Sequence, residues 1–363
     1  MNGGARSPDP VGRVLELLAG KWLTAAISAA ATLGIPDALA DRPKSLDCLA
    51  REVGCEPSAL ARLLRVLVGE ELLRENPDRE FELLEAGRLL RSDALGRLAR
   101  YVGSPLGWEP WSELVHAVRT GESSFVKRHG APLFEYLDRH PAEATLYNEA
   151  MEAFAQREAV ALAEQHDFST ARHVLDVGGG RGGLLVELLS RFPHLSGALL
   201  ERPAAVREAR ETFQCAGLAA RCEAQVGDFF DAIPEGADVC ILKHIVHCWD
   251  DDTAATLLQR CGDAVGPDGR VLVVEGILVR GGRRNLTNML DLEMLVLCGP
   301  GHERSKPELR RLFSRAGLRL LESKPLTETA RLFVTQRRSV TQPRVVTQER
   351  PATKPGPRRG ARA

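Results

Sequence analysis

A glycine-rich segment at residues 173–184 constrains the fold of this chain more than any other stretch of its sequence. An apolar run at 173–177 is typical of a buried strand and leads into a turn with five glycines among residues 178–183. A helical pattern follows at once. Glycines in such a strand–turn–helix unit let the backbone turn sharply and approach a ligand closely. The segment therefore predicts the first strand and helix of a doubly wound sheet.

The spacing of the turn residues fits two cofactors. Asp176 stands two positions before the first glycine, which gives the pattern Asp176-x-Gly178-x-Gly180-x-Gly182, typical of loops that hold S-adenosylmethionine. The same glycines fit Gly178-x-Gly180-x-x-Gly183, the dinucleotide fingerprint. A turn with no nucleotide function is a third interpretation. The rest of the sequence has to decide among the three.

Length, charge and cysteine pattern exclude several classes of protein. At 363 residues the chain is long enough for two domains. A formal net charge of -1 gives no field that favours nucleic acid or an anionic membrane. We find no apolar run of membrane-spanning length and no signal-peptide layout. The eight cysteines include no Cys-x-x-Cys pair, so we expect reduced cysteines in a cytoplasmic protein without a structural metal.

The N-terminal part has the pattern of a winged-helix domain. Helical periodicity runs through residues 11–40, interrupted by the Gly-Ile-Pro-Asp turn near its end. Two further helices, 46–54 and 57–68, resemble a helix-turn-helix unit. Apolar runs at 72–75 and 80–84 flank an Asn-Pro-Asp turn and predict a short hairpin.

From residue 173 onward, short β-rich runs alternate with helical stretches. This alternation predicts a mostly parallel sheet covered by helices, with two final strands antiparallel at its edge. The predicted strands are 173–177, 196–200, 222–226, 238–243, 270–275, 319–324 and 330–335. The whole chain then divides into a disordered start (1–10), a winged-helix-like domain (11–100), a helical linker or substrate lid (101–165), a Rossmann-like α/β domain (166–336) and a disordered basic tail (337–363).

Polar residues follow five consecutive predicted strands at the points where the strands end. Because ligands of open parallel sheets bind at the carboxyl ends of the strands, these residues are candidates for the site. They are Asp176, Glu201, Asp228 with Phe229, the segment from Lys243 to Trp249, and Glu275. One or two such residues arise readily as turn caps, but five in succession favour a binding site.

This set suits S-adenosylmethionine better than a dinucleotide. Asp176 can serve the ammonium group of the ligand, whereas an added carboxylate would repel a pyrophosphate. Glu201 can accept hydrogen bonds from the ribose of either cofactor. Asp228 can accept a hydrogen bond from the adenine amino group while the ring of Phe229 covers the base. The helix that follows Gly183 presents free N–H groups to the ligand.

His247 is the candidate reactive group. An imidazole titrates near neutral pH and can take a proton from a phenol or enol, whose oxygen then attacks a methyl group in line. Glu275 can hydrogen-bond the other ring nitrogen and fix the tautomer. We expect His244, three positions earlier, to pack or to cap a helix. The sequence shows no cluster of carboxylates with metal-ligand spacing, so we expect no metal.

Together these motifs resemble those of the caffeic-acid-type O-methyltransferases of small molecules, including bacterial relatives that tailor polyketides and other natural products. The resemblance extends over residues 11–335. It is carried by Asp176-Val-Gly-Gly-Gly-Arg-Gly182, Gly227-Asp228-Phe-Phe, Lys243-x-x-x-His247-x-Trp249, Val274-Glu275, Asp291-Leu-Glu-Met294-Leu, Glu303-Arg304-Ser and Ala316-Gly317-Leu. Several spaced motifs in one order are far more specific than the glycine turn alone.

The resemblance implies an S-adenosylmethionine-dependent O-methyltransferase and assigns its residues. His247 would be the general base, flanked by Glu275 and Glu303. The cofactor site would comprise Asp176, Gly178, Gly180, Glu201, Asp228, Phe229 and Lys243. The acceptor, a hydroxylated aromatic or polyketide-like molecule, would meet Met151, Phe154, Trp249, Asp291, Met294 and Cys298. The winged-helix part would form a homodimer through the apolar face around Trp22.

The sequence departs from the family pattern at three places. Glu201 stands where an aspartate is common, and its longer side chain should still reach a ribose. Cys248 replaces the usual polar residue after the histidine. Residues 299–303 are a variant of a glycine-rich stretch, so the position of Glu303 is less well defined than that of Glu275.

Three alternatives differ in the residues that they require. A DNA-binding regulator would need a more basic recognition helix than 57–68, which offers only Arg62 and Arg65. A nicotinamide oxidoreductase would need neither Asp228 nor a histidine–glutamate pair at the strand ends. A relative that binds the same cofactor but performs hydroxylation, decarboxylation or ring closure would keep the cofactor residues. Retention of His247 favours methyl transfer over this last alternative.

Overall fold

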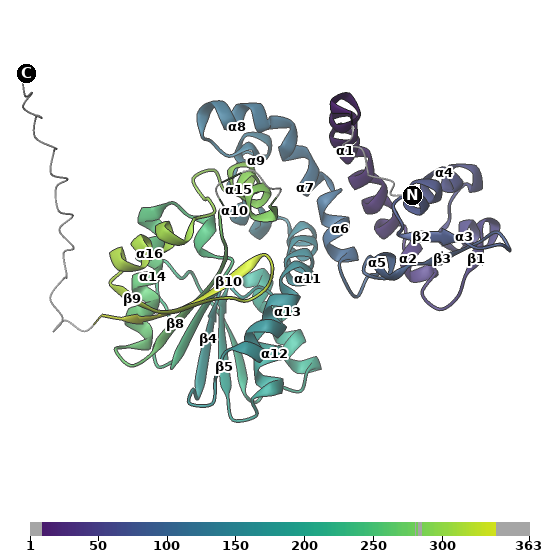
Figure 1. Ribbon diagram of the computed structural model, residues 1–363. Coiled ribbons are helices and arrows are strands. Elements are labelled where there is room, and N and C mark those ends of the chain that lie inside the picture. The colour runs from purple at the N-terminus through teal and green to yellow at the C-terminus, as the bar shows by residue number, and fades with distance from the viewer. Residues whose placement is uncertain (1–8, 280, 282–284, 339–363) are drawn as a thin grey trace, which may run out of the picture.

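The computed structural model describes residues 9–279, 281 and 285–338, which form a mainly helical N-terminal part and a C-terminal α/β part (Figure 1). The disorder that we predicted at the two ends lies, for residues 1–8 and 339–363, outside the described residues. Pro10 already begins the first helix, and Arg337 ends the last strand. The regular structure is therefore slightly longer at both ends than the sequence predicted.

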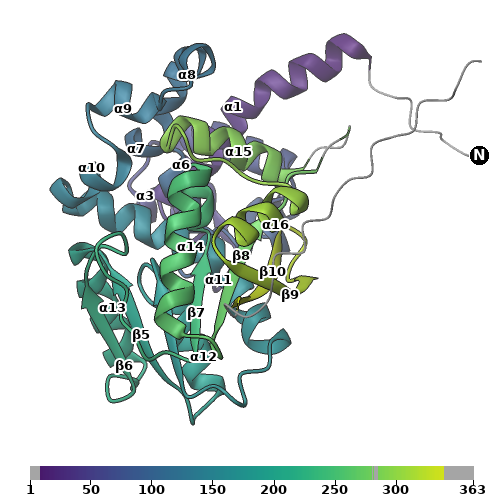
Figure 2. The ribbon, with the colours of Figure 1, turned by 90° about the vertical axis from the view of Figure 1, so that its left-hand side faces the viewer.

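Helix α1 (Pro10–Thr32) opens the described chain. The side chain of Asp9 caps it by accepting a hydrogen bond from the backbone N–H of Gly12, and the left-handed Gly34 separates it from α2 (Ile35–Ala38). We expected no membrane-length apolar run, but α1 is long and apolar enough to cross a membrane by length and composition, alone among the described helices. Figure 2 shows α1 projecting from the body of the molecule.

The predicted helix pair and hairpin of the N-terminal part are confirmed. Helices α3 (Leu46–Val53) and α4 (Pro57–Gly69) are followed by β2 (Leu73–Glu75), which pairs antiparallel with β3 (Glu80–Leu83). The short strand β1 (Lys44–Ser45) pairs with the other edge of β3. Apolar side chains of these helices and strands form one buried cluster with the end of α1 and with α2. This part therefore has a core of its own.

A run of helices connects the N-terminal part to the sheet. These elements are α5 (Glu85–Arg88), α6 (Gly96–Val102), α7 (Pro105–Trp108), the 3-10 helix η1 (Glu109–Glu113), α8 (Leu114–Thr120), α9 (Ser124–His129), α10 (Leu133–Arg139) and α11 (Pro141–Gln165). The longest, α11, packs against α6 on one side and against the α/β part on the other. Glu152 of α11 forms ion pairs with Arg97 of α6, at 2.8 Å, and with Arg181 of the glycine turn, at 3.3 Å. Helix α11 thus joins the two parts of the molecule.

The C-terminal part contains a seven-stranded sheet in the order β6-β5-β4-β7-β8-β10-β9. Its strands are β4 (His173–Val177), β5 (Ser196–Glu201), β6 (Cys222–Val226), β7 (Val239–Lys243), β8 (Arg270–Gly276), β9 (Leu318–Pro325) and β10 (Ala330–Arg337). The first five are parallel, and β10 pairs antiparallel with both β8 and β9. The predicted doubly wound sheet with an antiparallel edge is confirmed.

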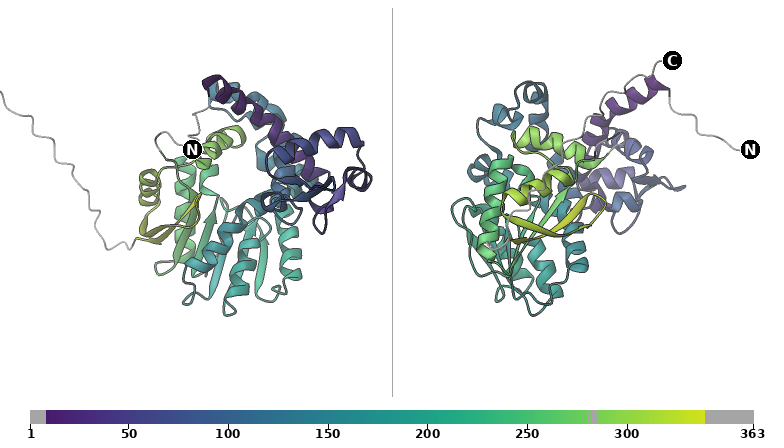
Figure 3. Two further views of the ribbon diagram at one scale, coloured as in Figure 1. Left: turned by 45° about the vertical axis from the view of Figure 1, so that its right-hand side comes forward. Right: turned by 60° about the vertical axis from the view of Figure 1, so that its left-hand side comes forward.

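Side chains of the strands alternate between two apolar layers, as strand geometry requires. Val174 enters the layer that contains side chains of α11, α12 and α13, whereas Leu175 enters the layer with α14 and α16. The covering helices are α12 (Gly183–Arg191), α13 (Pro203–Cys215), α14 (Asp251–Val265) and α16 (Lys306–Arg315). Figure 3 shows them on both faces of the sheet, with the N-terminal helices (purple) beyond one end. Because β4 to β8 are parallel, their carboxyl ends lie at one shared edge of the sheet.

Candidate active site

A cavity of about 1140 Å³ lies at the carboxyl ends of the parallel strands. Its walls come from the glycine turn after β4, from the carboxyl ends of β5 and β7, and from helices that include α1, α6, α11 and α15 (Leu286–Leu297). Most of the predicted site residues line it: Met151, Phe154, Gly178, Gly180, Glu201, Asp228, Phe229, Lys243, His247, Trp249, Met294 and Cys298. The predicted residues Asp176, Glu275, Asp291 and Glu303 lie behind this lining.

The glycine turn has the backbone geometry that its sequence suggested. Gly178 and Gly180 have φ angles of 73° and 59°, which side chains other than glycine rarely adopt. A Cβ atom on Gly178 would lie 2.6 Å from Cδ1 of Ile245. On Gly179 it would lie 2.0 Å from Oδ2 of Asp176. The turn therefore requires glycine in order to pass close over Asp176.

Asp176 is fully buried beneath this turn. Neither carboxylate oxygen has a hydrogen-bond partner among the described residues. Burial raises the pKa of Asp176 to about 7, a rise that Lys243 opposes and Glu201 reinforces. We expected Asp176 to serve the ammonium group of a ligand, but the structure places it behind the lining.

Two further acids line the cavity with their oxygens partly engaged. Glu201 accepts hydrogen bonds from the backbone N–H of Gly180 (3.2 Å) and of Arg202 (2.5 Å). Burial raises the pKa of Glu201, while these two hydrogen bonds lower it. Asp228 accepts a hydrogen bond from the backbone N–H of Phe230 at 2.7 Å through one oxygen. The second oxygen of Asp228 has no hydrogen-bond partner among the described residues, so it can accept a hydrogen bond from a ligand.

The glycine turn, the two acids and the neighbouring aromatic rings fit an adenosyl group. Phe229 lines the cavity beside Asp228, and its ring lies 6.1 Å from that of Trp249 in an edge-to-face arrangement. Carboxylates suit the hydroxyl groups of a ribose and the amino group of adenine, and an aromatic ring can cover the base. The residues at this end of the cavity are therefore compatible with S-adenosylmethionine.

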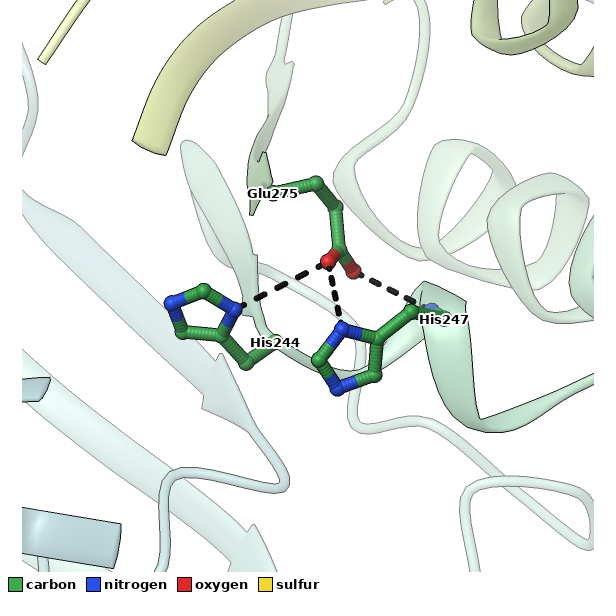
Figure 4. A group of neighbouring side chains, drawn as sticks. All are labelled: His244, His247 and Glu275. Carbon is green, nitrogen blue, oxygen red and sulfur yellow. Dashed lines mark hydrogen bonds and ion pairs between the residues drawn. The ribbon is translucent and has the colours of Figure 1, made fainter. Parts of the chain in front are cut away.

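His247 lies on a 3-10 turn, η2 (Val246–Cys248), directly after β7, and its ring is nearly buried at the cavity wall. Its Nδ1 is 3.1 Å from Oε2 of Glu275 and 3.0 Å from Oε1 of Glu303. Glu275 also accepts hydrogen bonds from the backbone N–H groups of Val246 and His247, at 2.8 and 3.2 Å. Figure 4 shows the second ring nitrogen of His247 pointing away from Glu275. The carboxylates thus hold Nδ1 and leave Nε2 available.

The two carboxylates strengthen this imidazole as a base. Burial lowers the pKa of His247, but the charges and hydrogen bonds of Glu275 and Glu303 raise it well above its ordinary value. Burial raises the pKa of Glu275, but the charge and hydrogen bonds of His247, together with the charge of His244, lower it overall. An imidazole in this setting accepts a proton readily because the imidazolium that forms is paired on its far side.

Glu303 owes its position to contacts that local sequence patterns did not suggest. Its backbone N–H donates to Oδ1 of Asp291 at 2.8 Å. The next residue, Arg304, is buried and donates to the carbonyl oxygens of Val246 (3.0 Å) and Trp249 (2.7 Å) on either side of His247. Asp291, which we expected to face the acceptor, instead anchors the loop that carries Glu303.

His244 is a residue of the cavity lining to which the sequence analysis assigned no chemical role. We expected it to pack or to cap a helix, but it lines the cavity with a positive φ of 57°. Its Nε2 lies 2.5 Å from Oε2 of Glu158, a buried residue of α11, and its Nδ1 lies 3.8 Å from Oε2 of Glu275. The signal was a second histidine in the segment between β7 and α14. Glu158 had no signal, because it lies on a helix far away in the sequence.

The same residues include one group with metal-like spacing. The ligand atoms of His244, His247 and Glu275 lie within 4.8 Å of one another. These contacts are also the ordinary hydrogen bonds and ion pairs of imidazoles with carboxylates (Figure 4). Independence from metal remains a prediction.

Two family models match the chain. An O-methyltransferase domain matches residues 111–319, and an O-methyltransferase dimerisation domain matches residues 15–93. Among curated proteins, the chain is 39% identical to the mitomycin biosynthesis 6-O-methyltransferase of Streptomyces lavendulae, over 86% of this chain and 90% of that protein. It is also 35% identical to aclacinomycin 10-hydroxylase RdmB of Streptomyces purpurascens, over 85% of this chain and 84% of that protein.

Solved structures give the same result. The mitomycin 7-O-methyltransferase MmcR has a TM-score of 0.80 and 37% identity, over 90% of this chain and 97% of that chain. A second solved structure is the O-methyltransferase NcsB1 of neocarzinostatin biosynthesis, in complex with S-adenosylmethionine and 2-hydroxy-5-methyl naphthoic acid. It has a TM-score of 0.71 and 32% identity, over 86% of this chain and 95% of that chain. These matches set aside a DNA-binding regulator and a nicotinamide oxidoreductase. The chain belongs to the family of S-adenosylmethionine-dependent O-methyltransferases that includes bacterial natural-product tailoring enzymes.

Proposed function

We propose that this enzyme methylates a hydroxyl group of an aromatic small molecule, with His247 as the general base. One observation carries the proposal: Nδ1 of His247 is held by two buried carboxylates while the ring lines a large cavity beside a cofactor site. A tailoring enzyme of this family needs a base at that place, because a phenol is a far better nucleophile after it loses its proton.

The chain's own residues would act as follows. S-adenosylmethionine supplies an electrophilic methyl group when it is bound. Nε2 of His247 takes the proton of the acceptor hydroxyl, and Glu275 and Glu303 stabilise the imidazolium that forms. The cavity walls hold the acceptor oxygen in line and exclude water. Orientation of this kind contributes much of the acceleration in transfers between two bound molecules.

The acceptor half of the cavity suits a flat, largely apolar molecule. Met151 and Phe154 of α11, Met294 of α15 and Cys298 directly after α15 all line the cavity. Aromatic and sulfur-bearing side chains pack well against ring systems. The solved relative NcsB1 contains a hydroxylated naphthoic acid, which supports an aromatic acceptor.

We also propose that the enzyme is a cytoplasmic homodimer without nucleic-acid or membrane partners. The N-terminal half of α1 exposes several large apolar side chains, among them Leu15, Leu18 and Trp22, whose exposed fractions are 61, 66 and 73%. The dimerisation-domain match includes these residues. A second copy of the chain would cover this face, which also accounts for the membrane-like composition of α1.

Two measurements test the function. Calorimetry with S-adenosylhomocysteine should show saturable micromolar binding, and NADH should not bind; no binding of S-adenosylhomocysteine would overturn the cofactor assignment. Incubation of the enzyme with S-adenosylmethionine and a panel of aromatic hydroxyl compounds should then yield products that have gained one CH2. A product that has gained one oxygen would instead favour a hydroxylase, the activity named for the relative RdmB.

A further inference from the structure

Glu293 is an acid on the wall of the cavity that the reaction described above does not use. It lies on α15, one position before Met294, and its half-buried side chain contributes to the lining. Sequence reasoning singled out its neighbours Asp291 and Met294 but passed over Glu293. Asp291 turns away to hold the loop of Glu303, whereas Glu293 faces the chamber.

The described surroundings of Glu293 contain aromatic side chains and no cation that pairs with it. Its described hydrogen-bond partner is the side chain of Trp111, and no described Lys, Arg or His forms an ion pair with it. The titratable groups within its electrostatic range are the buried phenol of Tyr101, the phenol of Tyr147 and the thiol of Cys298. Lys21 of α1 also lines the cavity, where its Nζ lies 5.9 Å from the centroid of the Trp108 ring.

Other acids of the lining are already compensated or exposed, which distinguishes Glu293. Glu152 forms ion pairs with Arg97 and Arg181. Glu201 and Asp228 accept hydrogen bonds from backbone N–H groups. A further pair joins Asp138 to Arg202, and Glu135 is exposed. Among the described acids of the lining, Glu293 is therefore the half-buried one with neither a positive partner nor a backbone N–H donor.

A carboxylate in an apolar wall is costly unless a partner compensates its charge. Burial raises the pKa of Glu293 to about 7, and the hydrogen bond from Trp111 lowers it only in part. A leucine or methionine at this position would continue the wall at no such cost. The acid is thus best explained by a group that arrives with the acceptor.

We propose that Glu293 binds an ammonium group of the acceptor, so that the substrate is a hydroxyarene that also carries a basic amine. This inference rests on the proposed function, since it requires His247 to receive the hydroxyl group. His247, Glu293 and Cys298 all line the same cavity, so the base and the acid face one chamber. An acceptor with two polar ends would be oriented by both groups, and the apolar walls would hold its ring between them.

Matched probes test this assignment by calorimetry with the enzyme saturated with S-adenosylhomocysteine. Tyramine carries an ammonium group, and para-ethylphenol has the same ring and hydroxyl without it. We expect wild type to bind tyramine about tenfold more tightly, since a hydrogen bond to a charged group contributes roughly that factor. Glu293→Gln keeps the shape of the side chain and should abolish the preference. Glu211→Gln, an exposed change on α13 outside the lining, should preserve it.

A second readout separates an ionic contact from a packing effect. Because the pKa of Glu293 is raised to about 7, the affinity of wild type for tyramine should increase between about pH 6 and about pH 8 as the carboxylate ionises. The affinity of Glu293→Gln should not change with pH in this way. A merely structural role for Glu293 would leave this pH dependence untouched in the variant.

The failures of the two proposals are distinguishable. Equal affinity of wild type for both probes would overturn the role of Glu293, and so would failure of both probes to bind while S-adenosylhomocysteine still binds. An equal loss of affinity for both probes in Glu293→Gln would also contradict it, because it would indicate a change in shape. Loss of S-adenosylhomocysteine binding by wild type would instead contradict the proposed function.

Discussion

Nδ1 of His247 and Oε1 of Glu303 lie 3.0 Å apart although 56 positions separate them in the chain. Glu303 belongs to the loop between α15 and α16. The side chain of Asp291 on α15 holds that loop by accepting a hydrogen bond from the backbone N–H of Glu303. The helix that forms one wall of the acceptor chamber therefore also positions a partner of the base.

Replacing His247 should remove catalysis and spare cofactor binding. We expect His247→Ala to lower kcat by about a hundredfold or more, the usual contribution of a general base. Because alanine leaves Glu275 and Glu303 without their shared partner, His247→Asn is the better test: its amide can still donate to them. Affinity for S-adenosylhomocysteine, measured by calorimetry, should stay within about twofold of wild type, since His247 serves the acceptor. An equal loss of turnover and cofactor affinity would contradict the role as base.

The pH dependence of the reaction should report the raised pKa of His247. The base is active when neutral, so kcat/KM should increase with pH through this pKa and level off above it. Glu303→Gln removes one of the two negative charges that raise the pKa. Its rising limb should therefore move to lower pH, and its plateau should fall because the imidazolium is less stabilised. Initial rates across the pH range measure both effects, and a limb that stays in place in Glu303→Gln would refute the coupling.

Asp228 should matter for the cofactor and not for the proton transfer. Asp228→Ala removes a carboxylate with one free oxygen at the adenosyl end of the cavity, and we expect the dissociation constant for S-adenosylhomocysteine to rise about tenfold or more. The matched control is Asp231→Ala, which removes an exposed carboxylate three positions on, outside the lining. If both variants bind the ligand as wild type does, Asp228 does not belong to the adenine site.

The sheet and the cofactor end of the site could be predicted from local sequence. Asp176 lies in β4, Glu201 ends β5, and Asp228 lies in the turn after β6, as the sequence predicted. These positions could be predicted because short buried strands leave a strong pattern. The same pattern cannot tell whether a side chain at a strand end faces the crevice. Asp176, for example, lies beneath Gly179 because of the path that the backbone of the turn takes, and the sequence pattern does not show this path.

The part of the site made by distant contacts could not be predicted in this way. The pair of His244 with Glu158 joins residues 86 positions apart, and Arg304 reaches across 58 positions to Val246. Such contacts depend on how α11 and the loop before α16 cross the strand ends. The spacing of apolar residues along the sequence contains no information about these crossings. Glu293 was missed for a related reason: on a helix with apolar neighbours, an acid suggests a solvent-exposed face until the cavity is known.

The apolar face of α1 should hold two copies of the chain together. Leu18 is 66% exposed in the single chain. Exposure of such a large apolar side chain to water is unfavourable, and a partner would cover it. Leu18→Asp should shift the enzyme from dimer to monomer in sedimentation velocity, because a buried unpaired carboxylate at an interface is strongly unfavourable. Leu321→Asp, an exposed position on the edge strand β9, should remain dimeric and serves as the control. A dimer that survives Leu18→Asp, or a wild type that sediments as a monomer, would place the interface elsewhere or exclude it.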